Sequence, residues 1–250
     1  MRMQEVPEAI NMPSREGSNG QHDPRWAAVD DFAISALVPA NDPYQEALQY
    51  AVDQSAKQGL PAIEVSLLQG RFLQMQCIAA NAENILEVGT LGGYSSILLA
   101  TSSPQAHVTT VEVDAHHAQV ARDVHAHAKL SDRIDVRLGS GMDVLPTLAD
   151  EVREGKREKF NFVFIDADKE NNLNYLNLAI PMCEARAVIV VDIVCRGGKL
   201  VDPEAVKAEP RVQGSRMVVE AAGKDERLVC SLMQTVGEKG YDGFLMCVVK

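Results

Sequence analysis

The sequence predicts an α/β domain with a mostly parallel sheet, helices on both faces of the sheet and extra helices at the N-terminus. Between residues 84 and 191, five apolar runs of strand length alternate with segments of helix length. The end of the chain adds two further strand candidates joined by a glycine-containing connection. Because 250 residues can bury a substantial core as one unit, a second domain is not required.

The N-terminal part of the chain differs in composition from the rest. Residues 1–24 are rich in Pro, Gly, Ser, Asn and charge, which predicts a flexible tail. We expect a single domain over residues 25–250, with a helical segment at 25–80 and the sheet core at 81–250. Apolar residues recur with helical spacing from Trp26 to about Ala56.

Two local signals divide this helical segment. Asp42-Pro43 predicts a helix start, because proline is favoured at the first helical position. Gly59-Leu60-Pro61 ends that helix, and Leu67–Ala80 then predicts a second amphipathic helix.

The central alternation defines the parallel part of the sheet. Its predicted strands are Asn84–Val88, His107–Val113, Arg133–Leu138, Phe160–Ile165 and Ala187–Val191. Its predicted helices are Gly93–Ala100, Ala115–Lys129, Met142–Glu154 and Glu170–Glu184. Strands that alternate with helices of this length are typical of a parallel sheet covered on both faces.

The C-terminal part breaks the alternation. A helix is predicted from about Gly214 to Gly223, followed by strands at Leu228–Val236 and Phe244–Val249. The letters "GEKGYDG" join these two strands, and Gly with Asp-Gly in a short connection favours a hairpin. We therefore expect seven strands, with the last two lying antiparallel to each other at one edge of the sheet.

Composition limits the partners. The net charge is −11 and the pI is near 5.0, so no basic surface is expected to bind nucleic acid. No apolar stretch reaches membrane-spanning length, and no signal pattern opens the chain. The five cysteines are scattered without a C-x-x-C pair, which is typical of reduced thiols. We expect a cytoplasmic protein that does not bind membranes.

A glycine turn follows the first strand of the core in "ILEVGTLGGYSS". Gly89, Gly92 and Gly93 allow a ligand to approach the backbone at the start of the next helix. Their spacing is not G-x-G-x-x-G, which disfavours a dinucleotide. Glu87 precedes the turn, and an acid there suits an ammonium or sulfonium group. Ser95 is placed to bond a carboxylate at the helix start.

Two more loops at strand ends carry candidate ligand contacts. The second strand ends in Glu112 and Asp114, and an acid about 20 residues after a glycine turn commonly holds ribose hydroxyls. The alternative for either acid is a helix cap. Gly139, Ser140 and Gly141 follow the third strand, where they are expected to flank an adenine ring.

The most informative run is "NFVFIDADKENNLNY". An apolar strand ends abruptly in Asp166, Asp168 and Lys169, and charges at a strand end mark where an open α/β sheet presents its chemistry. Asp166 and Lys169 are three residues apart and face the same way if a helix starts here. The next strand ends similarly, in Asp192, so the acids and the lysine are expected to form one site.

The histidines are numerous enough to suggest a metal site, but their spacing argues against one. Five lie between His107 and His127, yet no pair has i, i+4 spacing on the predicted helix and no cysteine is close. We interpret them as a solvated polar face.

Taken together, these motifs resemble a known enzyme family. "ILEVGTLGGYSS", "VEVD", "LGSGMDVLPTL", "FVFIDADKENNLNY" and "VDIVCRGGKLVDP" are similar to the class I S-adenosylmethionine-dependent O-methyltransferases, in particular the cation-dependent caffeoyl-CoA and catechol O-methyltransferase group. "LLQGRFLQM" and "GYDG" also resemble that group. The resemblance covers roughly Ser66 to the C-terminus and implies a Rossmann-like seven-stranded sheet whose last strand is antiparallel.

The resemblance also implies roles for individual residues. Gly89, Ser95 and Glu112 would hold the methionine and ribose parts of S-adenosylmethionine, and Gly139 to Met142 would lie against adenine. Lys169 would be the base that accepts the proton of a phenolic or catechol-type hydroxyl. The family's usual homodimer implies the same assembly here.

A divalent metal such as Mg²⁺ is implied as well, held by Asp166, Asp192 and the residue that follows Asp192. That residue is Asn in the family and Ile193 here, and an isoleucine side chain cannot coordinate a cation. If no metal binds, Asp166 is expected to orient Lys169 or the cofactor's ammonium group. Cys195-Arg196 replace the usual tryptophan, and Asn172 replaces the usual tyrosine, so the acceptor is expected to differ from a phenylpropanoid.

Two other functions are compatible with parts of the pattern. One is an NAD(P)-dependent reductase on a similar sheet, against which the missing G-x-G-x-x-G and the acid at Glu87 argue. The other is a non-catalytic protein that binds S-adenosylmethionine, which Ile193 motivates.

Overall fold

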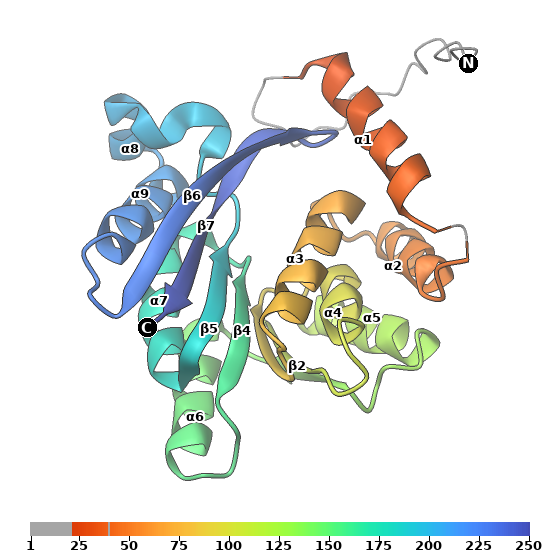
Figure 1. The fold of residues 1–250 in the computed structure, drawn as a ribbon, viewed down its shortest axis with the longest axis horizontal. Helices are drawn as coiled ribbons and strands as arrows, with labels where there is room; N and C mark the ends of the chain where they lie inside the picture. The colour runs from red at the N-terminus through yellow and green to blue at the C-terminus, as the bar shows by residue number, and fades with distance from the viewer. Residues whose placement is uncertain (1–21, 40) are drawn as a thin grey trace.

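Seven strands form one mixed sheet in the computed structural model, which describes residues 22–39 and 41–250 (Figure 1). The strand order is β3-β2-β1-β4-β5-β7-β6. The strands are β1 (Asn84–Val88), β2 (His107–Glu112), β3 (Ile134–Leu138), β4 (Phe160–Ile165), β5 (Cys183–Val191), β6 (Leu228–Gly237) and β7 (Gly240–Val249). The predicted fold class, with a Rossmann-like sheet and helices on both faces, is confirmed.

The direction of the strands separates two parts of the sheet. β1 pairs in parallel with β2 and β4, and β3 and β5 extend the parallel part on either side. β7 is inserted between β5 and β6 and runs antiparallel to both. The last strand is therefore the antiparallel one, and β6 forms the edge, as expected of the C-terminal hairpin.

Helices cover both faces of the sheet (Figure 1). The helical elements are α1 (Pro24–Leu37), α2 (Gln45–Lys57), α3 (Leu67–Ala79), α4 (Tyr94–Ala100), α5 (Ala115–His127), α6 (Gly141–Arg153), η1 (Lys169–Asn171), α7 (Asn172–Ala179), η2 (Ile180–Met182), η3 (Arg196–Val201), α8 (Pro203–Ala208) and α9 (Pro210–Ala222). α2 to α5 contribute to one core cluster, and α6, α7 and α9 contribute to the other.

The two cores follow from alternation within the central strands. In β4, Phe162 and Phe164 belong to the cluster on the α3–α5 side, whereas Val163 and Ile165 belong to the opposite cluster. All four side chains are fully buried. A strand buried on both faces reads as a continuous apolar run, which is why the sequence signal for β4 was strong.

The N-terminal helices differ from the sheet core in burial. α1 has no buried residue and contacts β6 and α3, whereas α2 packs Leu48 and Ala51 into the core. The second helix begins two residues later than Asp42-Pro43 predicted, because these residues form a turn in which Asp42 accepts the Tyr44 N–H at 2.9 Å. Most of the predicted tail lies outside the described residues.

Other differences from the prediction lie in the C-terminal part of the chain. The last hairpin turns over Glu238 and Lys239, so most of "GEKGYDG" belongs to the strands rather than to the connection. The predicted helix at 170–184 is interrupted by η1 and η2, and β5 begins at Cys183. α8 was not predicted, although the Asp202 side chain caps it. Within the described part of the chain, no helix is long and apolar enough to cross a membrane.

Candidate active site

Acids lie at the carboxyl ends of three neighbouring strands. Glu87 lies near the end of β1, Asp166 follows β4 and Asp192 follows β5. These strands are consecutive and parallel in the sheet, so their carboxyl ends meet at one edge. The Asp166 N–H donates to Val88 O at 2.8 Å, and the Asp192 N–H donates to Ile165 O at 3.0 Å. The sheet therefore brings together the strand-end acids that the sequence indicated.

Lys169 forms an enclosed ion pair with Asp166. Its Nζ donates to Asp166 Oδ1 at 2.6 Å, and the lysine and aspartate side chains are only 8% and 19% exposed. The three-residue spacing brings the two together as expected, although η1 is a 3₁₀-helix. An enclosed pair is screened less by salt than a surface pair. The arrangement holds an amine at the strand ends, where a substrate hydroxyl could reach it.

Asp192 is buried and has a partner from a distant part of the chain. Gln69 Nε2, from the first turn of α3, donates to Asp192 Oδ1 at 2.6 Å. Burial raises the pKa of Asp192 and the nearby Asp166 charge raises it further, while Lys169 lowers it. Sequence reasoning missed the role of Gln69, because no local pattern links residues so far apart in the chain.

The third metal-ligand position of the family pattern is occupied here by Ile193. Ile193 has no side-chain oxygen, and Gln69 and Lys169 already donate to the two carboxylates. Among residues 22–39 and 41–250, no three His, Cys, Asp or Glu side chains form a group that could hold a metal ion. These residues do not fit the three-ligand site that the resemblance implies, so we assign them no metal-dependent step.

The glycines of the turn after β1 allow close internal contacts. Gly89 has φ 107°, and a Cβ there would lie 2.5 Å from Asp166 O. Gly93 has φ 81°, and a Cβ would lie 2.4 Å from His125 Nε2. The two glycines let the turn approach the end of β4 on one side and α5 on the other. The turn is thus fixed against the strand end that carries Asp166.

His125 does not belong to a solvated face, so that interpretation of the histidines was wrong for this residue. It is 1% exposed, and its Nε2 lies 3.3 Å from Gly93 O. Burial lowers the pKa of His125 to about 4, so the imidazole is neutral at pH 7. Helical spacing turns this residue from solvent towards the glycine turn.

Glu87 is fully buried within a set of hydroxyl groups. Ser95 Oγ and Thr110 Oγ1 each donate to its carboxylate at 2.6 Å, and Ser96 donates as well. Burial raises the pKa of Glu87 to about 7, although the hydroxyl hydrogen bonds act in the opposite direction. These contacts join β1, β2 and the start of α4. The expected contacts of Glu87 and Ser95 with a cofactor remain predictions.

Glu112 supports the glycine turn from the end of β2. Its Oε2 accepts the N–H groups of Thr90 and Leu91 at 3.2 and 2.8 Å, and its Oε1 accepts the Asp114 N–H at 3.0 Å. A carboxylate offers about four acceptor positions, so these bonds leave capacity for a ligand hydroxyl. Asp114, in contrast, caps α5 through its side chain. The helix-cap alternative holds for Asp114 and not for Glu112.

The loop after β3 leads directly into α6. Ser140 caps this helix with its side chain, and Gly139 has φ 149°. Gly141 packs closely against Tyr175, because a Cβ would lie 2.6 Å from Tyr175 Cε1. Met142 is partly exposed at the start of the helix. These residues follow β3 as expected, and their contact with adenine remains a prediction.

Comparison with known proteins identifies the family. The model of the O-methyltransferase family matches residues 39–248. The chain belongs to the O-methyltransferase family. It is 43% identical over 228 residues to O-methyltransferase imqG of Aspergillus flavus, with 91% of this chain and 92% of that protein covered. It is 42% identical to a catechol O-methyltransferase of Mycobacterium tuberculosis, with 89% and 95% covered.

A solved structure supports the same assignment. The O-methyltransferase from Bacillus cereus in complex with SAH has a TM-score of 0.83 and 40% identity, covering 90% of this chain and 99% of that chain. The protein is therefore an S-adenosylmethionine-dependent O-methyltransferase. This assignment replaces the alternative of a nicotinamide-dependent reductase.

The loop after β5 of this O-methyltransferase is fastened by Asp242 of β7. Asp242 Oδ1 accepts the N–H groups of Cys195 and Arg196 at 3.0 Å each. Cys195 is buried, and burial raises the pKa of its thiol to about 11, so a reactive thiolate is disfavoured. Asp242 was predicted to lie in a turn. In the structure it belongs to β7, which pairs with β5 and so brings Asp242 to the loop that follows β5.

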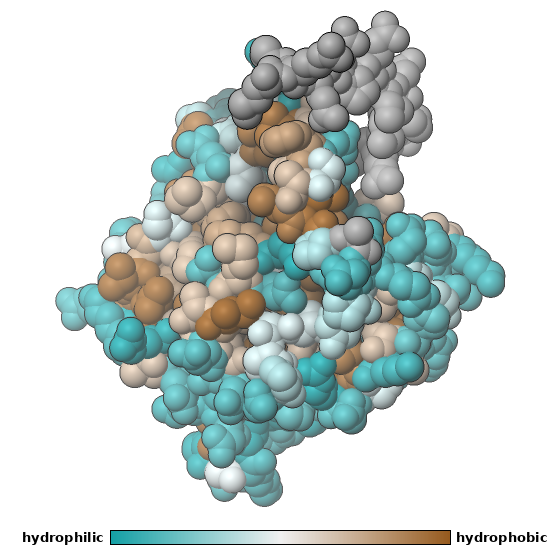
Figure 2. All heavy atoms as spheres, turned by 45° about the vertical axis from the view of Figure 1, so that its right-hand side comes forward, coloured by the Kyte–Doolittle hydropathy of each residue, from teal (hydrophilic) through white to brown (hydrophobic). Residues whose placement is uncertain are grey.

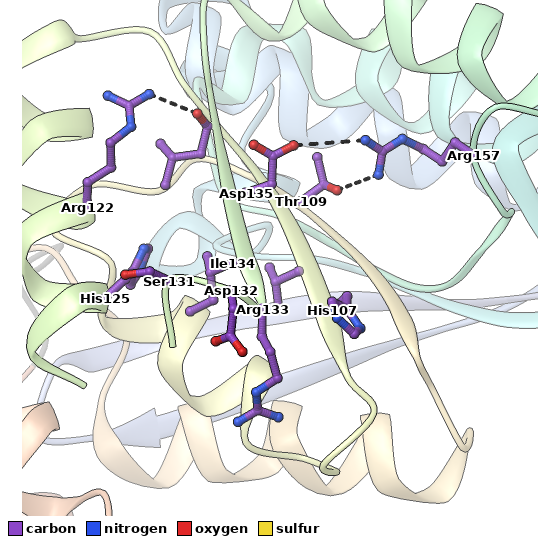
Figure 3. A pocket seen from close by; sticks show the side chains of 12 residues that line it. His107, Thr109, Arg122, His125, Ser131, Asp132, Arg133, Ile134, Asp135 and Arg157 are labelled. Carbon is purple, nitrogen blue, oxygen red and sulfur yellow. Dashed lines mark hydrogen bonds and ion pairs between the residues drawn. The ribbon is translucent and has the colours of Figure 1, made fainter. Parts of the chain in front are cut away.

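A hollow elsewhere in the O-methyltransferase lies at the opposite edge of the sheet (Figure 3). It has a volume of about 560 Å³ and is lined by the amino-terminal ends of β2 and β3 and by α5. Its arginines are largely occupied within the protein: Arg122 donates to Val136 O at 2.9 Å, and Arg157 donates to Thr109 Oγ1 at 2.8 Å. The strand-end acids do not line it, so it is not the candidate active site.

Proposed function

We propose that this enzyme methylates a phenolic or catechol-type hydroxyl of a small molecule, with Lys169 as the base. The observation that carries the proposal is the enclosed pair of Lys169 and Asp166 beside the buried Asp192. An amine held beside a carboxylate can take a proton from a hydroxyl that lies within reach. The name of the Mycobacterium tuberculosis relative supports an acceptor of the catechol class.

For the cofactor, we propose that Glu112 binds the ribose hydroxyls of S-adenosylmethionine and that residues 139–142 lie against its adenine. The unfilled acceptor capacity of the Glu112 carboxylate fits a hydroxyl donor. We propose that Gly89 and Ser95 lie against the methionine part of S-adenosylmethionine. When bound, S-adenosylmethionine supplies a methyl group on a sulfonium sulfur and leaves as an uncharged thioether.

The proposed proton transfer balances this change in charge. Lys169 first releases the proton of its ammonium form to solvent, and the resulting amine accepts the proton of the hydroxyl as the oxygen takes the methyl group. The positive charge that leaves the sulfur is then carried by the lysine ammonium, which Asp166 stabilises at 2.6 Å. Alignment of the hydroxyl with the methyl group supplies much of the rate in such a displacement. This step does not involve the Mg²⁺ that the resemblance implies at Asp166 and Asp192.

We also propose a homodimer, because apolar side chains are exposed on neighbouring elements. The exposed set consists of Val29, Phe32 and Leu37 on α1, Met75 and Ile78 on α3, and Val229, Met233 and Val236 on β6. Figure 2 shows hydrophobic side chains gathered across the upper and middle parts of the view. Contiguous exposed apolar surface commonly marks a protein–protein contact.

Five free cysteines favour a cytoplasmic location, and the charge of −11 disfavours nucleic acid as a partner.

The test is methyl transfer from labelled S-adenosylmethionine to a panel of phenols and catechols, with EDTA and with added Mg²⁺. We expect a methyl ether from at least one phenolic class, together with saturable SAH binding measured by calorimetry. SAH binding without transfer to any member of the panel would contradict the proposed acceptor class. An enzyme that binds neither SAH nor S-adenosylmethionine would contradict the proposed cofactor contacts.

A further inference from the structure

Ile193 lies beside the strand-end acids in an unusual backbone conformation. It directly follows the buried Asp192, and its φ of 56° is in the left-handed region. A β-branched residue rarely adopts this conformation, because its side chain clashes with the backbone there. The surrounding structure must therefore hold the residue in place, and here Ser215 Oγ donates to Ile193 O at 3.5 Å.

The side chain of Ile193 is not part of the apolar core. It is only half-buried, and it belongs to neither of the two apolar clusters formed by the described residues. Its neighbours Val191 and Val194 are both buried members of one cluster. An apolar side chain that is held in a strained conformation without filling a core is available to contact a ligand at the carboxyl edge of the sheet.

The polar groups around Ile193 are already paired within the chain. Gln69 Nε2 donates to Asp192, and Lys169 Nζ donates to Asp166, each at 2.6 Å. The charge of each acid is thus met by a protein donor rather than left for a cation. A hydroxyl placed against Ile193 would find no hydrogen-bond partner on that side chain, and a buried hydroxyl without a partner weakens binding.

We propose that Ile193 makes this site select an acceptor with a single free hydroxyl, flanked by hydrogen or an apolar substituent, over a catechol chelated by a divalent cation. The inference rests on the proposed function and narrows its substrate class. The free hydroxyl faces Lys169, which takes its proton, and the flanking ring position lies against Ile193. Ile193 is therefore a specificity-determining residue, and Lys169 acts without a metal.

The experiment measures binding of two matched probes, 4-nitrophenol and 4-nitrocatechol, to the SAH-bound enzyme with EDTA and with Mg²⁺. Their absorbance reports ionisation of the bound hydroxyl. The variant Ile193→Asn adds a side-chain oxygen and suits the left-handed backbone, since asparagine tolerates positive φ. Ile193→Val is the matched control, because it keeps a branched apolar side chain. Calorimetry with SAH alone first checks each variant for cofactor binding.

In the wild-type enzyme and in Ile193→Val, we expect 4-nitrophenol to bind about tenfold more tightly than 4-nitrocatechol, with no effect of Mg²⁺. In Ile193→Asn, we expect the preference to move at least tenfold towards 4-nitrocatechol when Mg²⁺ is present. Mg²⁺-dependent binding of 4-nitrocatechol to the wild type would overturn the proposal, and so would an Ile193→Asn variant with unchanged preference. A wild-type enzyme that does not bind SAH would instead count against the proposed function.

Discussion

At the scale of single residues, four acids near the strand ends have different roles because their partners differ. Glu87 is surrounded by hydroxyl groups, Glu112 accepts backbone N–H groups of the glycine turn, Asp166 pairs with Lys169, and Asp192 accepts the Gln69 amide. The sequence indicated them for different reasons: Asp166 and Asp192 follow apolar strands, Glu87 precedes the glycine turn, and Glu112 ends the strand after it. The contacts of each carboxylate separate Glu112, which binds the backbone of the turn, from Asp166, for which we propose a role beside the base Lys169.

Replacement of Lys169 tests the proposed base. In Lys169→Arg the positive charge beside Asp166 is kept, but the side chain cannot accept a proton, so we expect kcat to fall by roughly 10²–10⁴. SAH affinity, measured by calorimetry, should change less than about threefold, because the proposed cofactor contacts lie on other loops. A variant that retains more than a tenth of wild-type kcat would remove Lys169 from the mechanism.

The buried Glu87 predicts a pH-dependent stability. Its pKa rises from 4.5 in the unfolded chain to about 7 in the fold, so it contributes stability below pH 4.5 that is lost as the pH rises through 7. The change is of the order of 3 kcal/mol. In Glu87→Gln this part of the pH dependence should disappear. Urea unfolding of both proteins at pH 4.5, 6 and 7.5 measures it.

The difference between wild type and variant is the quantity to compare. His125 titrates in the same range with the opposite sign, because its lowered pKa removes stability as the pH falls from 6.5 towards 4. Since His125 is present in both proteins, its contribution cancels. Parallel pH profiles for the two proteins would mean that Glu87 does not carry the raised pKa.

At the scale of elements, the turn between β1 and α4 joins the parts of the active-site edge. Gly89 approaches the end of β4, Gly92 would place a Cβ 2.0 Å from Ser55 Oγ of α2, and Gly93 touches α5. From the sequence, these glycines were expected to let a ligand approach the backbone closely. Their position in the fold adds contacts with three elements that are distant in the chain.

Gly89→Ala is expected to destabilise the protein by more than ~1 kcal/mol and to lower SAH affinity, because it combines positive φ with a contact at 2.5 Å to Asp166 O. Gly155→Ala is the matched control: its φ is 69°, but no atom lies within 4 Å of the added Cβ. Thermal unfolding and SAH calorimetry are the measurements. Equal effects of the two substitutions would show that backbone strain alone, and not the close approach to β4, explains the glycine.

At the scale of the whole molecule, the exposed apolar residues of α1, α3 and β6 predict self-association. α1 reaches the last hairpin, where Asp30 Oδ2 accepts the Glu238 N–H at 2.8 Å. Introducing a charge with Met233→Asp should convert the dimer into a monomer in sedimentation velocity, because an unpaired buried charge is strongly unfavourable. SAH binding should persist as evidence of an intact fold. A wild-type chain that is monomeric at micromolar concentration would contradict the proposed dimer.

The sequence alone determined the alternation of strands and helices, the C-terminal hairpin and the places where charges follow apolar strands. These features are local, since they depend on periodicity, turn residues and the burial of a strand on both faces. The motifs in their order also indicated the O-methyltransferase family, which the family match over residues 39–248 confirms.

The partners that each side chain meets depend on tertiary packing. The bond from Gln69 to Asp192, the enclosure of Glu87 and the burial of His125 join elements whose approach depends on the packing of the whole sheet. Ile193 illustrates the division: the sequence identified the residue as a departure from the family pattern. Its left-handed backbone and half-buried side chain, which only the fold determines, indicate what it can contact.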